Sequence, residues 1–290
     1  MIILLANNAA TLLAALNQYD CYAAVEAEFG TTEVKGSSEL LTLNHHIDES
    51  QPCPCSVDPS VFDSIRGQIE AVGLSHFDLD TLGGIMALKG IKPERESFWA
   101  LTEYVDLNGP HRVKENILYN ERDHILLASF WAWSKENRLF PNRDGSVSDV
   151  SDFVERAEKE LIGILNQEEE KVQRGKDFLK KEEDLKHESF VTAKNSVGVV
   201  LRKSTEFVNH LYYDHRDLPQ NYIVGFNSDM GKVTVSRAGD EGINCKEFVQ
   251  SLWGEGAGGR EGIAGSPREG GLTFDDALQA YKKLVEKLSQ

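Results

Sequence analysis

The sequence IEAVGLSHFDLDTLGG, residues 69–84, places an apolar run directly before three side chains that can bind a metal ion. The apolar run, residues 69–74, predicts a buried strand that continues into the polar segment. Side chains two positions apart on an extended strand point to the same face. His76, Asp78 and Asp80 are therefore predicted to converge on one ion where the strand ends.

Two glycines, Gly83 and Gly84, follow at once and allow another segment to pack closely as the chain turns into a helix. Ligand sites in open α/β sheets lie outside the carboxyl ends of the strands. An imidazole with two carboxylates suits a divalent ion such as Mn²⁺ or Mg²⁺ better than a thiolate-seeking ion. The alternative interpretation of this HxDxD pattern is a surface strand with an exposed pair of aspartates.

The first half of the chain alternates apolar runs with helical patterns, which is typical of βα units and a mostly parallel sheet. Buried strands are predicted at residues 2–6, 40–43 and 69–74. Helices are predicted at residues 9–16, 59–69, 98–105 and 123–133. Because 290 residues exceed the usual length of one domain, we expect a second domain.

Residues 151–188 are dense in Glu and Lys, lack proline and carry apolar residues at helical spacing. This pattern predicts a long, solvated connecting helix with a break near Gly175. Further strands are predicted at residues 197–201, 222–226 and 231–237, and further helices at 245–253 and 274–288. The predicted fold is therefore α/β with two domains joined by the helix. Residues 1–150 surround a mostly parallel sheet, and residues 189–290 a smaller mixed sheet.

The formal net charge of −16 is too acidic for a protein that binds long DNA or RNA, because such binding needs an excess of Lys and Arg. Local basic clusters can still bind a small phosphorylated molecule. The apolar start of the chain lacks a basic region, and its Asn and Gln side chains make it too polar for a membrane span. We therefore expect a cytoplasmic protein that does not bind membranes. Its oligomeric state stays open, with a homodimer as one option.

The four cysteines do not form a disulfide framework in a chain of this length. Cys53 and Cys55 belong to the segment QPCPC, residues 51–55, but no second cysteine pair completes a zinc site. We interpret this segment as a stiff loop with reduced thiols. A role in metal binding is the alternative.

Two more segments place His and Asp side chains at the ends of predicted elements. The segment LLTLNHHID, residues 40–48, is a predicted strand that ends in His45 and His46. Adjacent strand residues point to opposite faces, so only one of the two is expected to ligate an ion. Asp106 ends an apolar helical run just before a Gly-Pro turn, from which a carboxylate can reach a site. Taken alone, the histidine pair would be structural and Asp106 a helix terminus.

The segment GEGAGGREGIAGSPR, residues 254–268, contains a literal GxGxxG pattern. A dinucleotide-binding site is not expected, because a helical run and not a strand precedes it. Dense glycine exposes backbone N–H groups that can surround an anion, and Arg260 and Arg268 offer bidentate donors to a phosphate or carboxylate. We interpret the segment as an anion-binding loop. A merely flexible loop is the alternative.

Taken together, these motifs resemble the DHH phosphoesterase superfamily, which pairs an α/β catalytic domain with a C-terminal DHH-associated domain. The HxDxD pattern followed by glycine resembles its first motif. The tripeptide at residues 44–46, Asn-His-His, resembles its Asp-His-His motif, and residues 104–106 resemble a later aspartate motif. Residues 257–265 resemble the signature of the associated domain, and residues 231–237 the strand before it.

The chain also departs from the pattern of this superfamily. The histidine pair precedes HxDxD here, whereas in the superfamily it follows. We therefore expect a circularly permuted catalytic domain, in which residues 1–8 supply the strand of the second aspartate motif with Asn7 or Asn8 at its tip. Asn44 likewise replaces an acidic residue, and Arg260 replaces a histidine of the associated domain. These replacements favour an alternative, a catalytically degenerate nucleotide-binding or regulatory protein of the same fold.

The resemblance implies metal-dependent hydrolysis of a phosphoric ester. The implied ligands of one or two divalent ions, Mn²⁺ first and Mg²⁺ as the alternative, are His45, His76, Asp78, Asp80 and Asp106. The implied catalytic residues are His46, which would contact a phosphate oxygen or protonate the leaving group, and Asp80. The implied substrate contacts are Arg237, Gly258, Gly259, Arg260 and Arg268. The acidic surface favours a small phosphorylated compound, a nucleotide or a short oligonucleotide as the substrate.

Overall fold

The computed structural model describes residues 1–45, 51–191, 195–214, 216, 218–239, 241–267 and 269–290. The chain forms two compact units. The first unit consists of Met1–Leu107 and Glu115–Phe178, and the second of Asn108–Lys114 and Leu179–Gln290. The short segment Asn108–Lys114 belongs to the second unit, where His111 Nε2 lies 3.1 Å from the carbonyl oxygen of Ala238.

The first unit is built on a five-stranded sheet in the order β5-β2-β6-β1-β7. Its strands are β1 (Ile2–Leu5), β2 (Tyr22–Val25), β5 (Thr42–Leu43), β6 (Ala71–Leu74) and β7 (Ser148–Asp149). The first four strands in this order are parallel, and β7 pairs antiparallel with β1 at the edge. A separate two-stranded ribbon joins β3 (Glu28–Phe29) to β4 (Thr32–Glu33). The parallel strands all point their carboxyl ends toward one edge of the sheet.

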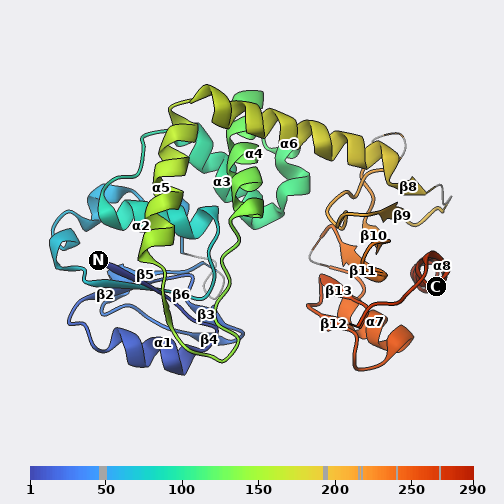
Figure 1. Ribbon diagram of the computed structural model, residues 1–290, viewed down its shortest axis with the longest axis horizontal. Helices are drawn as coiled ribbons and strands as arrows, with labels where there is room; N and C mark the ends of the chain where they lie inside the picture. The colour runs from blue at the N-terminus through green and yellow to red at the C-terminus, as the bar shows by residue number, and fades with distance from the viewer. Residues whose placement is uncertain (46–50, 192–194, 215, 217, 240, 268) are drawn as a thin grey trace. The chain divides into compact units, whose positions relative to one another are not determined.

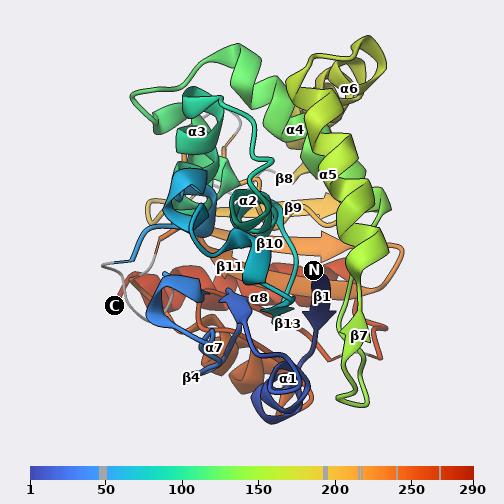
Figure 2. The same ribbon diagram turned by 90° about the vertical axis from the view of Figure 1, so that its left-hand side faces the viewer.

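The helices of the first unit lie on the faces of this sheet or pack on the helices that do (Figure 1). They are α1 (Ala9–Leu16), α2 (Leu79–Lys89), α3 (Glu96–Asn108), α4 (Glu121–Glu136), α5 (Ser151–Leu165) and α6 (Glu169–Glu188), the last of which continues into the second unit. Figures 1 and 2 show α1 on one face of the sheet and α2 and α5 on the other. A Cβ atom at Gly73 on β6 would lie 2.7 Å from Leu16 Cδ1, so this glycine lets α1 approach the sheet closely.

Two predicted elements near the middle of the first unit are shorter than expected. Residues 59–69 form two 3₁₀ turns, Pro59–Phe62 and Arg66–Gln68, in place of a helix. The Arg66 side chain donates to the carbonyl oxygens of Pro59 and Leu88, and these bonds hold the segment in a folded loop. The strand predicted at residues 40–43 is limited to β5, because residues 39–41 form a 3₁₀ turn.

The long charged helix breaks between α5 and α6, not at Gly175 as predicted. Gln167 adopts a φ of 61°, in the left-handed region that ends helices. Gly175 lies inside α6 where this helix crosses α4. A Cβ atom there would overlap with Ser129 Oγ and with the carbonyl oxygen of Ile125. The glycine is therefore a close-packing position and not a helix breaker.

The second unit contains a six-stranded mixed sheet in the order β12-β13-β11-β10-β9-β8. Its strands are β8 (Phe190–Val191), β9 (Val199–Ser204), β10 (Tyr222–Asn227), β11 (Lys232–Arg237), β12 (Gly258–Gly259) and β13 (Ile263–Gly265). β9 and β10 are parallel, and the other neighbours are antiparallel. Helices α7 (Cys245–Trp253) and α8 (Phe274–Leu288) end where the sequence predicted.

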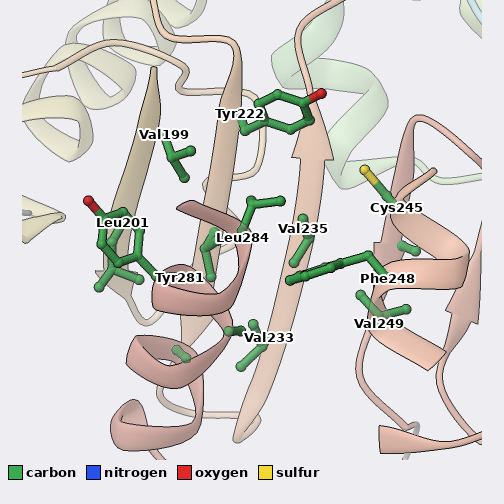
Figure 3. Close-up of a cluster of buried hydrophobic side chains, with 14 of the residues drawn as sticks. Val199, Leu201, Tyr222, Val233, Val235, Cys245, Phe248, Val249, Tyr281 and Leu284 are labelled. Carbon is green, nitrogen blue, oxygen red and sulfur yellow. The ribbon is translucent and has the colours of Figure 1, made fainter. Parts of the chain in front are cut away.

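The core of the second unit lies between its sheet and the helices α7 and α8. Figure 3 shows Val199, Val233 and Val235 from the strands among side chains of the two helices, including Phe248 and Leu284. Strand positions alternate between this core and a second, smaller cluster that contains Val200 and Ile223. The alternation has the period of two that a half-buried sheet requires.

A fully buried arginine anchors the end of α6 in the second unit. Arg202 on β9 donates to the carbonyl oxygens of Lys186, Leu211 and Tyr213, and to Ser189 Oγ. Lys186 lies in the last turn of α6, where carbonyl oxygens lack hydrogen-bond donors within the helix. The Arg202 guanidinium supplies a donor to one of them.

The predicted fold class is confirmed: both units are α/β, one with a mostly parallel sheet and one with a mixed sheet. The division between the units falls inside α6, after Phe178, and not at the two ends of the charged segment. None of the helices in the described part of the chain combines the length and the apolarity that crossing a membrane requires.

Replacing Gly175 with alanine tests the close crossing of α6 and α4. Alanine normally favours a helix interior over glycine by roughly 0.5–1 kcal/mol. Here the added methyl group meets a backbone carbonyl, so Gly175→Ala is expected to lower the free energy of unfolding by about 1–3 kcal/mol. Urea unfolding followed by circular dichroism measures the change. Gly67→Ala, with no heavy atom near the added Cβ, is the control, expected to stay within about 0.5 kcal/mol of wild type. A stabilised Gly175→Ala would contradict the close crossing.

Candidate metal centre

Three neighbouring strands of the first unit end in side chains that can hold a metal ion. Glu26 follows β2 directly, His45 lies just after β5, and His76 lies just after β6. Because β5, β2 and β6 are adjacent and parallel, their carboxyl ends bring these side chains to the same edge of the sheet. The start of α2 and the end of α3 add carboxylates to them.

The prediction of an extended strand from His76 to Asp80 is wrong. β6 ends at Leu74, and Asp78 is the N-cap of α2, where its carboxylate accepts the N–H of Thr81 at 2.9 Å. The Thr81 hydroxyl accepts the N–H of Asp78 at 2.8 Å in return, which completes a capping box. Asp80 therefore stands in the first turn of a helix. Asp78 and Asp80 therefore belong to two different groups of possible metal ligands.

The close packing predicted from Gly83 and Gly84 is confirmed, and the partner is the QPCPC segment. A Cβ atom at Gly83 would lie 2.7 Å from Cys55 Cβ, and one at Gly84 would lie 2.7 Å from Pro54 Cβ. At the same contact, the N–H of Cys55 donates to Asp80 Oδ1 at 2.8 Å. The loop thus lies directly on α2 and orients the Asp80 carboxylate.

Glu26, His45, Asp80 and Asp106 form what we call the inner group, whose ligand atoms all lie within 4.8 Å of one another. His45 Nε2 lies 3.0 Å from Glu26 Oε1 and 2.9 Å from Asp106 Oδ2. Asp80 Oδ2 lies 4.0 Å from the same nitrogen. Since Glu26, His45 and Asp80 are buried, little water is available to screen these charges.

The inner group concentrates charge in a buried place. Burial, together with the charge of Glu26, raises the pKa of Asp80 to about 8. Hydrogen bonds, first with Asp106 and then with Cys53, raise the pKa of His45 to about 12. Asp80 Oδ2 is buried and has no hydrogen-bond partner among the described residues. A divalent cation would both neutralise the carboxylates and give this oxygen a partner.

Glu26, His76 and Asp78 form the outer group. His76 Nε2 lies 3.0 Å from Glu26 Oε2 and 3.4 Å from Asp78 Oδ2. Burial lowers the pKa of His76, but hydrogen bonds with Asp78 and Glu26 outweigh it and raise the pKa to about 10. The side chains of His76 and Asp78 are 39% and 42% exposed, so the outer group opens to solvent where the inner group does not.

Ser75 fixes the ring of His76. The Ser75 hydroxyl donates to the carbonyl oxygen of Glu26 at 2.5 Å, and its oxygen lies 2.9 Å from His76 Nδ1. Because the single hydroxyl hydrogen is already used, His76 donates its Nδ1–H to Ser75 and turns Nε2 toward the carboxylates. Metal sites commonly orient a ligating histidine through such an outer hydrogen bond.

Glu26 joins the two groups and has an unusual backbone. Its φ of 44° lies in the left-handed region that few residues other than glycine adopt. Its N–H donates to the carbonyl oxygen of Leu43 at 2.8 Å, and its own carbonyl accepts from Ser75. The ends of β5 and β6 thereby hold the strained residue from both sides. One carboxylate oxygen faces His45 and the other faces His76, as in a carboxylate that bridges two ions.

These residues fit a divalent metal ion. In the described part of the chain, Asp78, Asp80 and Asp106 form ion pairs with histidines and not with Lys or Arg side chains. Carboxylate oxygens and imidazole nitrogens are the donors that divalent cations of the Mn²⁺ and Zn²⁺ kind accept. The buried acidic and histidine groups could therefore hold such an ion.

The structure places all five predicted metal ligands in the two groups that share Glu26: His45, Asp80 and Asp106 in the inner group, His76 and Asp78 in the outer group. Glu26 is not among the predicted ligands, although the short apolar run directly before it carries the same signal as the other strands. His46 lies outside the described residues. The predicted catalytic role of Asp80 stays a prediction.

The asparagines expected at acidic positions serve other purposes. Asn8 caps α1 by accepting the N–H groups of its first turn, and Asn7 donates to the carbonyl oxygen of Asn142 at 2.8 Å. Asn44 donates to Glu33 Oε1 at 3.0 Å. The acidic residue at the tip of a neighbouring strand is instead Glu26, at the end of β2.

The predicted anion-binding loop is a hairpin of the second unit. Gly258 and Gly259 form β12, which pairs with β13. Gly259 has a φ of 151°, and a Cβ atom there would lie 2.5 Å from Ala264 Cα, so close packing already requires this glycine. Arg268 lies outside the described residues.

The two remaining predicted arginines lie at this hairpin. Arg260 is exposed, and its N–H donates to the carbonyl oxygen of Ile263 at 2.7 Å. Arg237 ends β11 and donates its N–H to the carbonyl oxygen of Gly262 at 2.9 Å. A depression of ≈ 500 Å³ beside the hairpin is lined by Asn244, Lys246, Glu247, Gln250, Gly259, Arg260 and Glu261. Its charges are mixed, with two cationic and two anionic side chains.

Replacing Asp80 with asparagine tests whether the acidic cluster destabilises the metal-free protein. Because the folded state raises the pKa of Asp80 to about 8, ionisation of Asp80 near pH 7 favours the unfolded chain. Asp80→Asn is expected to raise the free energy of unfolding in EDTA by roughly 0.5–2 kcal/mol, measured by urea unfolding at pH 7. Asp78→Asn is the control, expected to change little because asparagine is also a good N-cap. A destabilised Asp80→Asn would contradict this account of the charge.

Comparisons with known proteins do not assign this chain to a family. No family model matches the sequence, and no curated protein matches it. A crystal structure of an uncharacterized protein from Helicobacter pylori G27 is similar over 85% of this chain and 74% of that chain, with 13% sequence identity and a TM-score of 0.24. A TM-score this low carries no argument about fold or function.

Proposed function

We propose that this protein is a metal-dependent phosphoesterase of the DHH kind, which hydrolyses a small phosphorylated compound, a nucleotide or a short oligonucleotide. One observation carries the proposal. Four carboxylates and two histidines from separate parts of the sequence meet at the carboxyl edge of a parallel sheet. Buried acidic clusters of this size are costly unless a cation neutralises them.

The inner and outer groups would each hold one divalent ion, with Glu26 shared between them. The outer group offers only oxygen and nitrogen donors, which favours Mn²⁺, with Mg²⁺ as the alternative. Divalent ions lower the pKa of water and neutralise charge on a phosphoryl group.

The inner group is buried and the outer group is partly exposed, so we assign them different roles. His45, Asp80 and Glu26 are buried and serve to hold charge in place. His76 and Asp78 open to solvent, so a phosphorylated substrate would approach from their side. Ser75 keeps the ring of His76 in one orientation, which preserves the geometry at this entrance during turnover.

The second unit carries cationic side chains of its own that could bind a phosphate or a carboxylate. Arg260 and Lys246 line its depression, and Arg237 lies at the same hairpin. Guanidinium groups donate paired hydrogen bonds to phosphate or carboxylate. The net charge of −16 supports a small substrate, because a long nucleic acid would be repelled over most of the surface.

A nucleotide-binding protein without turnover is the second candidate. The side chain of Asn44 supports it, since this residue stands where the resemblance expects an acid and hydrogen-bonds Glu33 outside both groups. Glu26 supports the enzyme, because it returns a carboxylate to the centre of the site.

Metal removal and replacement of one inner ligand test the proposed activity. Metal-stripped wild type is expected to bind one or two Mn²⁺ ions in calorimetry and to hydrolyse a chromogenic phosphodiester once Mn²⁺ is restored. Asp106→Asn is expected to lower kcat/KM by at least about 10²-fold, the usual loss when one electrostatic contribution at a reacting centre is removed.

Asp152→Asn, an exposed position in the first turn of α5, is the matched control and should leave Mn²⁺ binding and turnover unchanged. Mn²⁺ binding with no turnover of phosphodiesters, phosphomonoesters or dinucleotides would favour the nucleotide-binding candidate. An absence of Mn²⁺ binding would contradict both candidates as metalloproteins.

Arg260→Ala tests the role assigned to the hairpin. If Arg260 binds an anionic group, its loss is expected to weaken the binding of inorganic pyrophosphate about tenfold, because a charge-assisted hydrogen bond is lost. Calorimetry measures the dissociation constant. Arg216→Ala, at an exposed arginine paired with Asp214 in the same unit, is the control. Unchanged pyrophosphate binding in Arg260→Ala would contradict an anion-binding role of the hairpin.

A further inference from the structure

A cysteine lies against two residues of the inner group. Cys53 Sγ, a nitrogen of His45 and a carboxylate oxygen of Asp106 all lie within 4.8 Å of one another. The Cys53 thiol is buried, with 2% of the residue exposed, and it hydrogen-bonds with His45. His45 and Asp106 are therefore shared between this cysteine and the carboxylates of the inner group.

The cysteine is held in place by the packing of its loop on α2. Residues 54–56 form a 3₁₀ turn that begins at Pro54, and Cys53 is its N-cap residue. Cys55 donates its N–H to Asp80 Oδ1, and Gly83 and Gly84 leave space for the loop backbone. The same loop therefore fixes the position of Cys53 and the orientation of the Asp80 carboxylate.

The donor atoms at the two ends of the site differ in chemical softness. The outer group has nitrogen and oxygen donors only. At the inner end, sulfur, nitrogen and oxygen donors meet, and the buried oxygen Asp80 Oδ2 lacks a hydrogen-bond partner in the described part of the chain. Thiolate with imidazole and carboxylate is a donor set typical of Zn²⁺ and of Co²⁺ in its place, whereas Mg²⁺ and Mn²⁺ prefer oxygen.

We infer that Cys53 is a metal ligand, and that with His45 and Asp106 it makes the inner site selective for a Zn²⁺-class ion while the outer site takes Mn²⁺ or Mg²⁺. The inference rests on the proposed function only in requiring that the inner group holds an ion. Binding would release two protons to solvent, one from the Cys53 thiol and one from the protonated His45 ring, and the freed sulfur and nitrogen lone pairs would be donated to the ion. No redox step is involved.

Cobalt titration of the metal-stripped protein tests the inference directly. Co²⁺ bound to a thiolate gives a sulfur-to-metal charge-transfer absorption in the near ultraviolet, which oxygen and nitrogen ligands do not produce. Wild type and the control Cys21→Ser, a partly exposed cysteine outside the site, are expected to show this band until one ion is bound. Cys53→Ser is expected to lose the band. The Co²⁺ affinity of this variant is expected to fall on the order of tenfold or more, because even the loss of a residue that only orients a metal ligand lowers metal affinity by roughly this factor.

The outcomes separate this inference from the proposed function. Co²⁺ binding to wild type in calorimetry without the band would overturn the role of Cys53 and leave a metal-dependent hydrolase standing. A band that persists in Cys53→Ser would also overturn it, because another cysteine would then be the ligand. If wild type binds no divalent ion, both the inference and the proposed function fail.

A second variant replaces the soft ligand with a hard one. Cys53→Asp keeps an anionic ligand at the same place, so the ratio of Co²⁺ to Mn²⁺ affinity is expected to fall about tenfold or more relative to wild type. Circular dichroism shows whether the variant is folded before the titration. An unchanged ratio in the folded variant would overturn the claim that sulfur sets the selectivity of the inner site.

Discussion

The hydrogen bonds on both sides of the Glu26 backbone are the constraint on which the site depends. The N–H of Glu26 is bound to the end of β5, and its carbonyl is bound by Ser75 at the end of β6. These bonds hold a left-handed residue at the end of a central strand, a conformation that costs free energy in isolation. The result is a buried carboxylate whose two oxygens face two different histidines. Without this residue the inner and outer groups would be separate clusters.

The same site is a source of instability that the rest of the first unit must offset. Burying several carboxylates together opposes folding unless cations or protons neutralise them. The surrounding structure offsets this through apolar packing of α1 against the sheet and through ion pairs remote from the site, such as Lys89 with Glu158 at 2.5 Å. A buried acidic cluster kept at this cost is typical of a functional site, because stability and activity make opposing demands.

His76, Asp78 and Asp80 lie in groups that could hold a metal ion, as predicted, but the predicted geometry of residues 76–80 is wrong. Strand periodicity predicts one shared face, whereas the capping box of Asp78 and Thr81 starts a helix and separates the two aspartates. The glycines after them were interpreted correctly as a close-packing surface. That the partner would be the cysteine loop was not predictable, because a contact between residues 55 and 83 depends on the fold and leaves no local signal.

The sequence by itself determined the α/β class, the mostly parallel sheet implied by alternating elements, and five of the side chains that meet in the two groups, because these follow from local periodicity and donor chemistry. It also determined α1, α7 and α8 to the residue, since caps and apolar spacing mark their ends. Only the tertiary structure decided that Glu26 stands between the two groups and that Cys53 lies beside His45 and Asp106. Those positions depend on which strands become neighbours and which loop packs on α2, and such long-range contacts are set by the whole fold.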